Sequence, residues 1–141
     1  MKNKVLVYVV FLVFILSIPW INALMSSFTL EVQLEDREII LIGSHGQYKM
    51  NENYYSDTRL IHAGYYASIF NTLYLIKVKR TKLSADATFD VNEFVRGQQT
   101  FILLKLDHKK GGAYQIKHIE EDPRKGITQY PVTFEGDLGI L

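Results

Sequence analysis

The stretch FTLEVQLE, residues 28–35, determines the fold class that we expect for this chain. Apolar side chains occupy every second position of the stretch, and polar side chains occupy the positions between them. This period of two is typical of a β-strand that buries one face and exposes the other. The apolar positions are Phe28, Leu30, Val32 and Leu34.

More segments rich in β-branched and aromatic residues follow along the chain, separated by turn signals. We predict strands at residues 37–42, 59–80 with a turn at Asn71-Thr72, 100–107, 113–120 and 127–135. The polar residues 51–57 are predicted to form a loop. Pro131 has no N–H group, which predicts that the last strand is an edge strand. Six to eight short strands and almost no helix predict an all-β domain, a small antiparallel barrel or sandwich.

The segment before these strands is VLVYVVFLVFILSIPWINALM, residues 5–25, which has no charged residue and follows Lys2 and Lys4. As a helix it would be about 31 Å long, close to the thickness of a bilayer core. We interpret it as a membrane anchor, with the lysines holding the N-terminus in the cytoplasm. The alternatives are a signal peptide cut after Ala23 and a buried helix of a soluble protein.

The anchor and the signal peptide both divide the chain into residues 1–25, the anchor or signal, and residues 26–141, an extracytoplasmic β-rich domain. The second part is long enough for one modest hydrophobic core. Basic and acidic residues nearly balance, which disfavours nucleic-acid binding, because that binding depends on clustered Lys and Arg. The chain has no cysteine, so the fold must rely on its core, as is common in bacterial envelope proteins.

Histidine and carboxylate residues supply no recognisable catalytic motif. The four histidines, His45, His62, His108 and His118, are scattered and have no metal-ligand spacing, so we predict no metal site and no cofactor. No nucleophile elbow or phosphate-binding loop occurs. The enzymatic alternative is an anchored or secreted hydrolase that uses His45 or His62 with nearby carboxylates.

The densest group of aromatic residues suggests a binding surface. Tyrosine offers a large contact area with a polar tip, and two tyrosines lie within a polar segment, where core packing does not explain them. The candidate binding residues are Tyr54, Tyr55, Tyr65 and Tyr66. The simpler interpretation is that these side chains fill the core of a small β-domain.

Residues 64–71, GYYASIFN, keep the Gly, the Tyr and a Leu-like Ile of the signature Gly-Asp-Tyr-x-x-Leu-x-Val. Tyr65 replaces the Asp and Asn71 replaces the final Val. Gly97 then precedes a strand, and an acidic-Pro turn follows at Pro123. On these features the chain resembles the GDYXXLXV-domain proteins, small bacterial proteins with one N-terminal membrane segment and a β-rich domain outside the cytoplasm. The resemblance implies a location and a fold, and it carries over no catalytic residue.

We therefore predict a single-pass protein of the bacterial cell membrane whose β-domain lies outside the cytoplasm. It would act as a binding or accessory protein for another envelope protein or surface component, through exposed strand edges and aromatic loops. If the N-terminal segment is cleaved, the protein would be secreted or periplasmic. Besides the hydrolase, a further alternative is a subunit of a larger membrane assembly.

Overall fold

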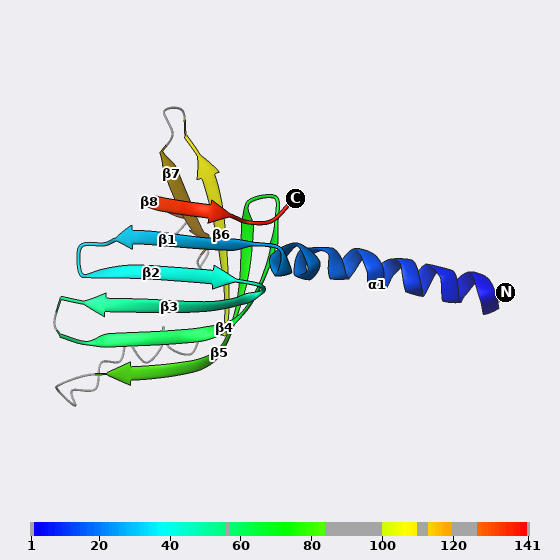
Figure 1. The fold of residues 1–141 in the computed structure, drawn as a ribbon, viewed down its shortest axis with the longest axis horizontal. Helices are drawn as coiled ribbons and strands as arrows, with labels where there is room; N and C mark the ends of the chain where they lie inside the picture. The colour runs from blue at the N-terminus through cyan, green and yellow to red at the C-terminus, as the bar shows by residue number, and fades with distance from the viewer. Residues whose placement is uncertain (1, 56, 84–99, 110–112, 120–126, 141) are drawn as a thin grey trace.

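The chain folds into one long N-terminal helix that projects from the end of a β-barrel (Figure 1). The computed structural model describes residues 2–55, 57–83, 100–109, 113–119 and 127–140. Gly97 and the acidic-Pro turn at Pro123, on which part of the sequence resemblance rests, lie outside these ranges.

The helix α1, Lys2–Leu24, contains the whole apolar run except its last residue. Most of its side chains between Val5 and Leu16 are more than half exposed, and it is the one helix in the described chain that is long and apolar enough to cross a membrane. Such a surface is stable in lipid and unfavourable in water. The helix ends where the Met25 N–H donates to the Asn22 carbonyl oxygen and the Ser26 N–H donates to that of Ala23.

Eight strands follow, and each pairs in an antiparallel manner with the next. They are β1 (Ser27–Gln33), β2 (Arg37–Ser44), β3 (Gln47–Tyr54), β4 (Arg59–Ile69), β5 (Thr72–Leu83), β6 (Phe101–His108), β7 (Tyr114–Ile119) and β8 (Ile127–Asp137). Strand β8 pairs back with β1, so the sheet closes into a barrel. The predicted class, an all-β antiparallel barrel behind an N-terminal apolar helix, is confirmed.

The core is the interior of the barrel, filled by every second residue of each strand. In β1 the alternating apolar positions 28, 30 and 32 face inward, as the opening stretch predicted. They pack with inward side chains from the other strands, including Leu41, Met50, Leu73, Leu75, Leu106 and Ile116. The interior of a small barrel is just wide enough to hold the inward side chains, so these side chains fill the middle of the barrel.

The barrel has two different ends. The proximal end receives α1 and carries the two-residue turns His45–Gly46 and Phe70–Asn71 together with the C-terminal residues. The distal end carries the connections between β1 and β2 and between β3 and β4. All four residues of the proximal turns have positive φ, the conformation of tight hairpin turns that match the twist of the strands.

Gly64 is required where two strands approach closely. The pairing of β4 with β5 shifts register between Ala63 and Gly64, which forms a bulge. A Cβ atom at Gly64 would lie 1.9 Å from the Ile76 carbonyl oxygen, so any side chain would force the strands apart.

Two details of the sequence prediction are wrong. Residues 51–54 belong to β3 and are not a loop, because each of them pairs across the sheet with a residue of β2 and all four are partly buried. Pro131 does not mark an edge strand, since β8 pairs with both β7 and β1. The register explains how the proline fits: the ladder to β1 begins only at Thr133, so no partner on that side needs the missing N–H. Because the sheet closes into a barrel, open strand edges remain among the described strands only where neighbouring strands overlap incompletely, as along β8 before Thr133.

Candidate functional site

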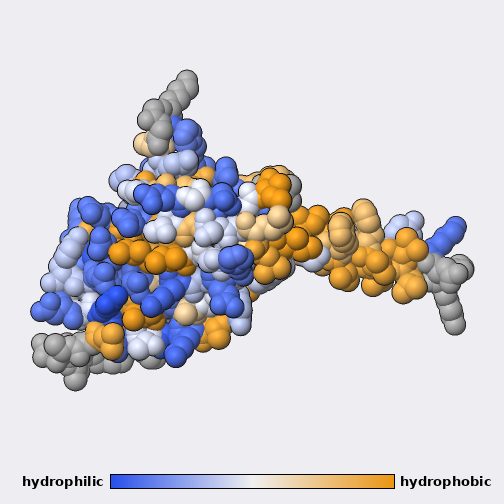
Figure 2. All heavy atoms as spheres, in the orientation of Figure 1, coloured by the Kyte–Doolittle hydropathy of each residue, from blue (hydrophilic) through white to orange (hydrophobic). Residues whose placement is uncertain are grey.

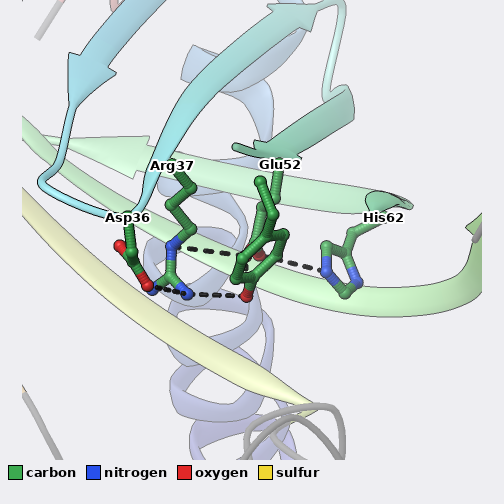
Figure 3. Close-up of polar contacts among 5 residues, drawn as sticks. Asp36, Arg37, Glu52 and His62 are labelled. Carbon is green, nitrogen blue, oxygen red and sulfur yellow. Dashed lines mark hydrogen bonds and ion pairs between the residues drawn. The ribbon is translucent and has the colours of Figure 1, made fainter. Parts of the chain in front are cut away.

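The inward side chains of β2, β3 and β4 change from apolar to polar toward the distal end. Along β3, Tyr48 and Met50 are followed by Glu52 and Tyr54 on the same face. Cross-strand pairing places Arg37 of β2 opposite Tyr54. We call Arg37, Glu52, Tyr54 and His62 the distal cluster (Figure 3).

Glu52 is the centre of the distal cluster. One carboxylate oxygen, Oε1, lies 3.1 Å from Nε2 of His62. The other, Oε2, accepts a hydrogen bond of 3.2 Å from the Tyr54 hydroxyl and lies 3.7 Å from Nε of Arg37. Nη1 of Arg37 donates to the Tyr54 hydroxyl at 2.6 Å, and the same atom is 3.7 Å from Oδ2 of Asp36. The four side chains therefore form a connected network.

The surroundings keep Glu52 ionised. Burial by itself would raise the pKa of this carboxyl group, but the hydrogen bond to His62 and the charge of Arg37 outweigh it, and the pKa is lowered. Lys77 of β5 lies near enough to respond to the same group: burial and repulsion by Arg80 lower its pKa, and the charge of Glu52 opposes them. Among the described residues, Arg37 and Lys77 thus lie near the Glu52 carboxylate, and the exposed Asp36 adds a second carboxylate beside Arg37.

Within the described residues, some buried polar atoms on the inner face of the barrel have no hydrogen-bond partner. They include Nδ1 of His62, a residue only 4% exposed, and the hydroxyl of Tyr48, which lies toward the proximal end of β3. Burial raises the pKa of Tyr48 to about 12. Unpaired buried polar groups are uncommon in folded proteins, and each one calls for a structural or functional reason.

A histidine bonded to a carboxylate is an arrangement that can act as a general base. For covalent catalysis it would also need a nucleophile on its second nitrogen, and within the described residues no side chain bonds Nδ1 of His62. In the part of the chain that the structure describes, no group of three His, Asp or Glu side chains could hold a metal ion.

A second polar network joins the helix to the proximal end of the barrel. The side-chain amide of Asn22 lies within hydrogen-bond distance, 2.9–3.1 Å, of the Ser68 carbonyl and hydroxyl oxygens and of the Leu138 carbonyl oxygen. Its own oxygen accepts a bond of 2.7 Å from the Ile140 N–H. Asn22 therefore ties α1 to β4 and to the C-terminal residues.

Two further buried side chains complete this junction. The hydroxyl groups of Ser26 and Tyr66 lie 2.6 Å apart, and Tyr66 also reaches the Ala23 carbonyl oxygen at 3.3 Å. Ala23 and Tyr66 are completely buried. We call Asn22, Ala23, Ser26, Tyr66 and Ser68 the junction. Through it the last turn of the helix forms part of the barrel's own core.

The four candidate tyrosines do not form one surface. Tyr54 lies in the distal cluster, Tyr55 is exposed in the distal turn after β3, and Tyr66 is buried in the junction at the opposite end. Tyr65, which is 51% exposed, faces outward from β4. The two histidines of the hydrolase alternative are also separated, because His45 lies in a proximal turn and His62 in the distal interior.

Tyr65 belongs to an exposed row on the outer wall of the barrel. It pairs across the strands with Ile76 of β5, which in turn pairs with Phe101 of β6. All three side chains are exposed, and Tyr74 contributes a ring 6.3 Å from that of Phe101. We call Tyr65, Ile76 and Phe101 the outer row.

Comparison with known proteins identifies no relative of this chain. No protein-family model matches the chain, and neither the curated proteins nor the solved structures include a significant match.

Sequence reasoning missed the most connected residues of both networks. Glu52 was assigned to a loop, and Asn22 was counted as one neutral residue of an apolar run. The available signals were the alternation of β3 continuing through polar residues and an amide in an otherwise apolar helix. Both signals are weak when the pairing of the strands is not known.

Proposed function

We propose that this protein is a membrane-anchored binding protein whose helix is retained and whose barrel lies outside the cytoplasm. The junction carries the first part of this proposal. Cleavage after Ala23 would remove Asn22 and Ala23, and with them a buried amide that bonds β4 and the C-terminal residues. The Ser68 carbonyl oxygen and the Ile140 N–H would lose this side-chain partner, while the Leu138 carbonyl oxygen would keep its bond from the Ser68 hydroxyl group. Each buried group left unpaired would cost about 1–3 kcal/mol.

The orientation rests on the two lysines before the apolar run, which favour a cytoplasmic N-terminus. It agrees with the location that the resemblance to GDYXXLXV-domain proteins implies. No step of this proposal takes an activity from that family.

The mass of the protein recovered from native membranes tests retention of the helix. We expect the full-length mass, and extraction should require detergent. A product that begins at residue 24 would replace the anchor with a signal peptide and would contradict the proposal.

Recognition of another envelope protein is supported by the outer row. Aromatic and aliphatic side chains exposed side by side on a rigid wall are suited to a protein interface, in which a few anchors supply most of the binding energy. The separate, exposed Tyr55 is compatible with a further contact at the distal end. Of the four candidate tyrosines, Tyr65 is therefore the one that we expect to contribute most.

A photo-crosslinking amino acid at position 65, compared with the same group at the exposed Glu31 of β1, tests this interface in intact cells. We expect one defined adduct from position 65 and none from position 31. Substituting Phe101→Ser should abolish that adduct. Equal or absent crosslinking at the two positions would contradict a binding role for the outer row.

The hydrolase alternative is favoured by one observation, the contact of 3.1 Å between His62 and Glu52. If it is correct, His62→Gln should abolish hydrolysis of simple chromogenic esters while the circular dichroism spectrum is unchanged. Absence of hydrolysis by the full-length protein would leave the distal cluster with a structural role.

A further inference from the structure

Several apolar side chains are exposed together at the proximal end of the barrel. The tip of the β4–β5 turn is Phe70, which is 73% exposed, and Leu24, Met25 and Ile140 are exposed at the same end of the barrel. Figure 2 shows apolar atoms continuing from the helix onto this end of the barrel. We call Leu24, Met25, Phe70 and Ile140 the proximal rim.

The conformation of Phe70 adds an independent observation. Phe70 and Asn71 have φ values of 47° and 60° and form a two-residue turn between the paired residues Ile69 and Thr72. This turn type favours Asn-Gly, and a bulky residue at positive φ is strained. The strain at an exposed aromatic residue points to a function for the ring outside the barrel.

The length of the helix indicates what covers the rim. Because Asn22 and Ala23 are buried in the junction, the part of α1 available to lipid after Lys4 is residues 5–21. At about 1.5 Å per residue this part is about 26 Å long, a few ångströms less than a typical hydrocarbon core of about 30 Å. The next strand begins at Ser27, so the short connection holds the barrel close to the membrane.

We propose that the proximal rim is embedded in the lipid interface, with Phe70 as its main anchor, so that the barrel rests directly on the bilayer. This inference rests on the proposed function, because it requires α1 to span the membrane. The apolar side chains of the proximal rim would make up the difference between the helix length and the thickness of the hydrocarbon core. Polar groups at the same end, including Asn71 and an Asp137 carboxylate that accepts a hydrogen bond from the Gly139 N–H, limit the depth to the headgroup region.

Tryptophan fluorescence in vesicles containing brominated phosphatidylcholine tests the depth. The chain has a single tryptophan, Trp20, on the helix, so Trp20→Phe provides a silent background for a reporter at Phe70→Trp. Val78→Trp, also exposed but on the distal half of β5, is the matched control. The full chain is used in each case, and circular dichroism checks its folding.

We expect the Phe70→Trp reporter to be blue-shifted and strongly quenched by bromines near the headgroup, and the Val78→Trp reporter to remain unquenched. Quenching of the natural Trp20 together with an unquenched Phe70→Trp reporter would overturn the rim contact and leave the anchor intact. Absence of quenching for Trp20 itself would instead contradict the anchor.

A second measurement avoids a large side chain in the strained turn. Because the chain has no cysteine, Ile140→Cys can be labelled with a polarity-sensitive fluorophore at one site. Its emission should shift to shorter wavelength in vesicles relative to the same label at Val78→Cys. Equal emission from the two sites would overturn the inference.

Discussion

At the scale of single residues, the stability of the barrel depends on whether each buried polar atom has a partner. Tyr48 and Tyr66 are both buried tyrosines of the interior, but only Tyr66 uses its hydroxyl group in hydrogen bonds. Hydrogen bonds add little to stability when formed, whereas an unpaired buried group costs more. The same residue type therefore has opposite effects on stability at two positions of the barrel interior.

This contrast predicts the outcome of paired substitutions. Tyr48→Phe removes an unsatisfied hydroxyl and should leave the free energy of unfolding unchanged or raise it by about 1 kcal/mol. Tyr66→Phe should lower it by at least about 1 kcal/mol, because the buried Ser26 hydroxyl loses one of its two hydrogen-bond partners. Denaturant titration in detergent measures both. Equal destabilisation by the two variants would contradict this account.

The distal cluster predicts a dependence on pH. The pKa of Glu52 is lower in the folded protein than its ordinary value of 4.5, so the unfolded chain binds the proton more readily. The stability that the ionised group contributes is complete above pH 4.5 and is lost as the pH falls through the folded pKa. Thermal unfolding followed between neutral and acid pH should show this loss.

Substitutions distinguish the contribution of Glu52 to stability from that of the other carboxylates. Glu52→Gln should cost about 3 kcal/mol at neutral pH, because the largely buried Arg37 keeps only the exposed Asp36 as a counter-charge, and the acid-dependent loss should shrink. Glu31→Gln, on the exposed face of β1, should change neither quantity. An unchanged acid transition in Glu52→Gln would show that another group controls it.

At the scale of elements, α1 combines an exposed apolar surface with a last turn that forms part of the barrel core. Its exposed apolar surface is suited to lipid, while its last turn holds β4 and the C-terminal residues by hydrogen bonds. This packing supports our proposal that the helix is retained. The helix end is thus the element whose alteration should affect the barrel most.

We expect Asn22→Leu to lower the free energy of unfolding by at least about 2 kcal/mol, although it makes the helix more apolar. The amide's hydrogen bonds to Ser68, Leu138 and Ile140 are lost, and the Leu138 carbonyl oxygen keeps its bond from the Ser68 hydroxyl group. Ile21→Leu, one residue earlier on the exposed side, is the control and should have little effect. Chemical denaturation in detergent measures the difference. Similar midpoints for both variants would argue against a structural role for the junction.

At the scale of the whole molecule, the short connection and the junction should make helix and barrel one rigid body. We expect a fluorophore on Val78→Cys to tumble at the rate of the whole protein–detergent particle. Inserting a Gly/Ser linker after Met25 should shorten the rotational correlation time measured by anisotropy decay. A barrel that already tumbles independently in the original chain would contradict the rigid connection.

The sequence by itself determined the periodic features. The alternation from Phe28 to Glu35 and the uncharged run of residues 5–25 depend only on neighbouring positions, so the strands and the apolar helix could be predicted from them. The same local patterns could not predict closure of the barrel, since any set of amphipathic strands also fits an open sandwich.

Only the tertiary structure decided the roles of individual polar residues. Asn22 meets partners 46 and 116 positions away, and Glu52 meets Arg37 and His62 because three strands turn their inner faces to one interior. The physical reason is that a buried polar group is stabilised by its hydrogen-bond partners, and folding brings those partners from distant parts of the chain.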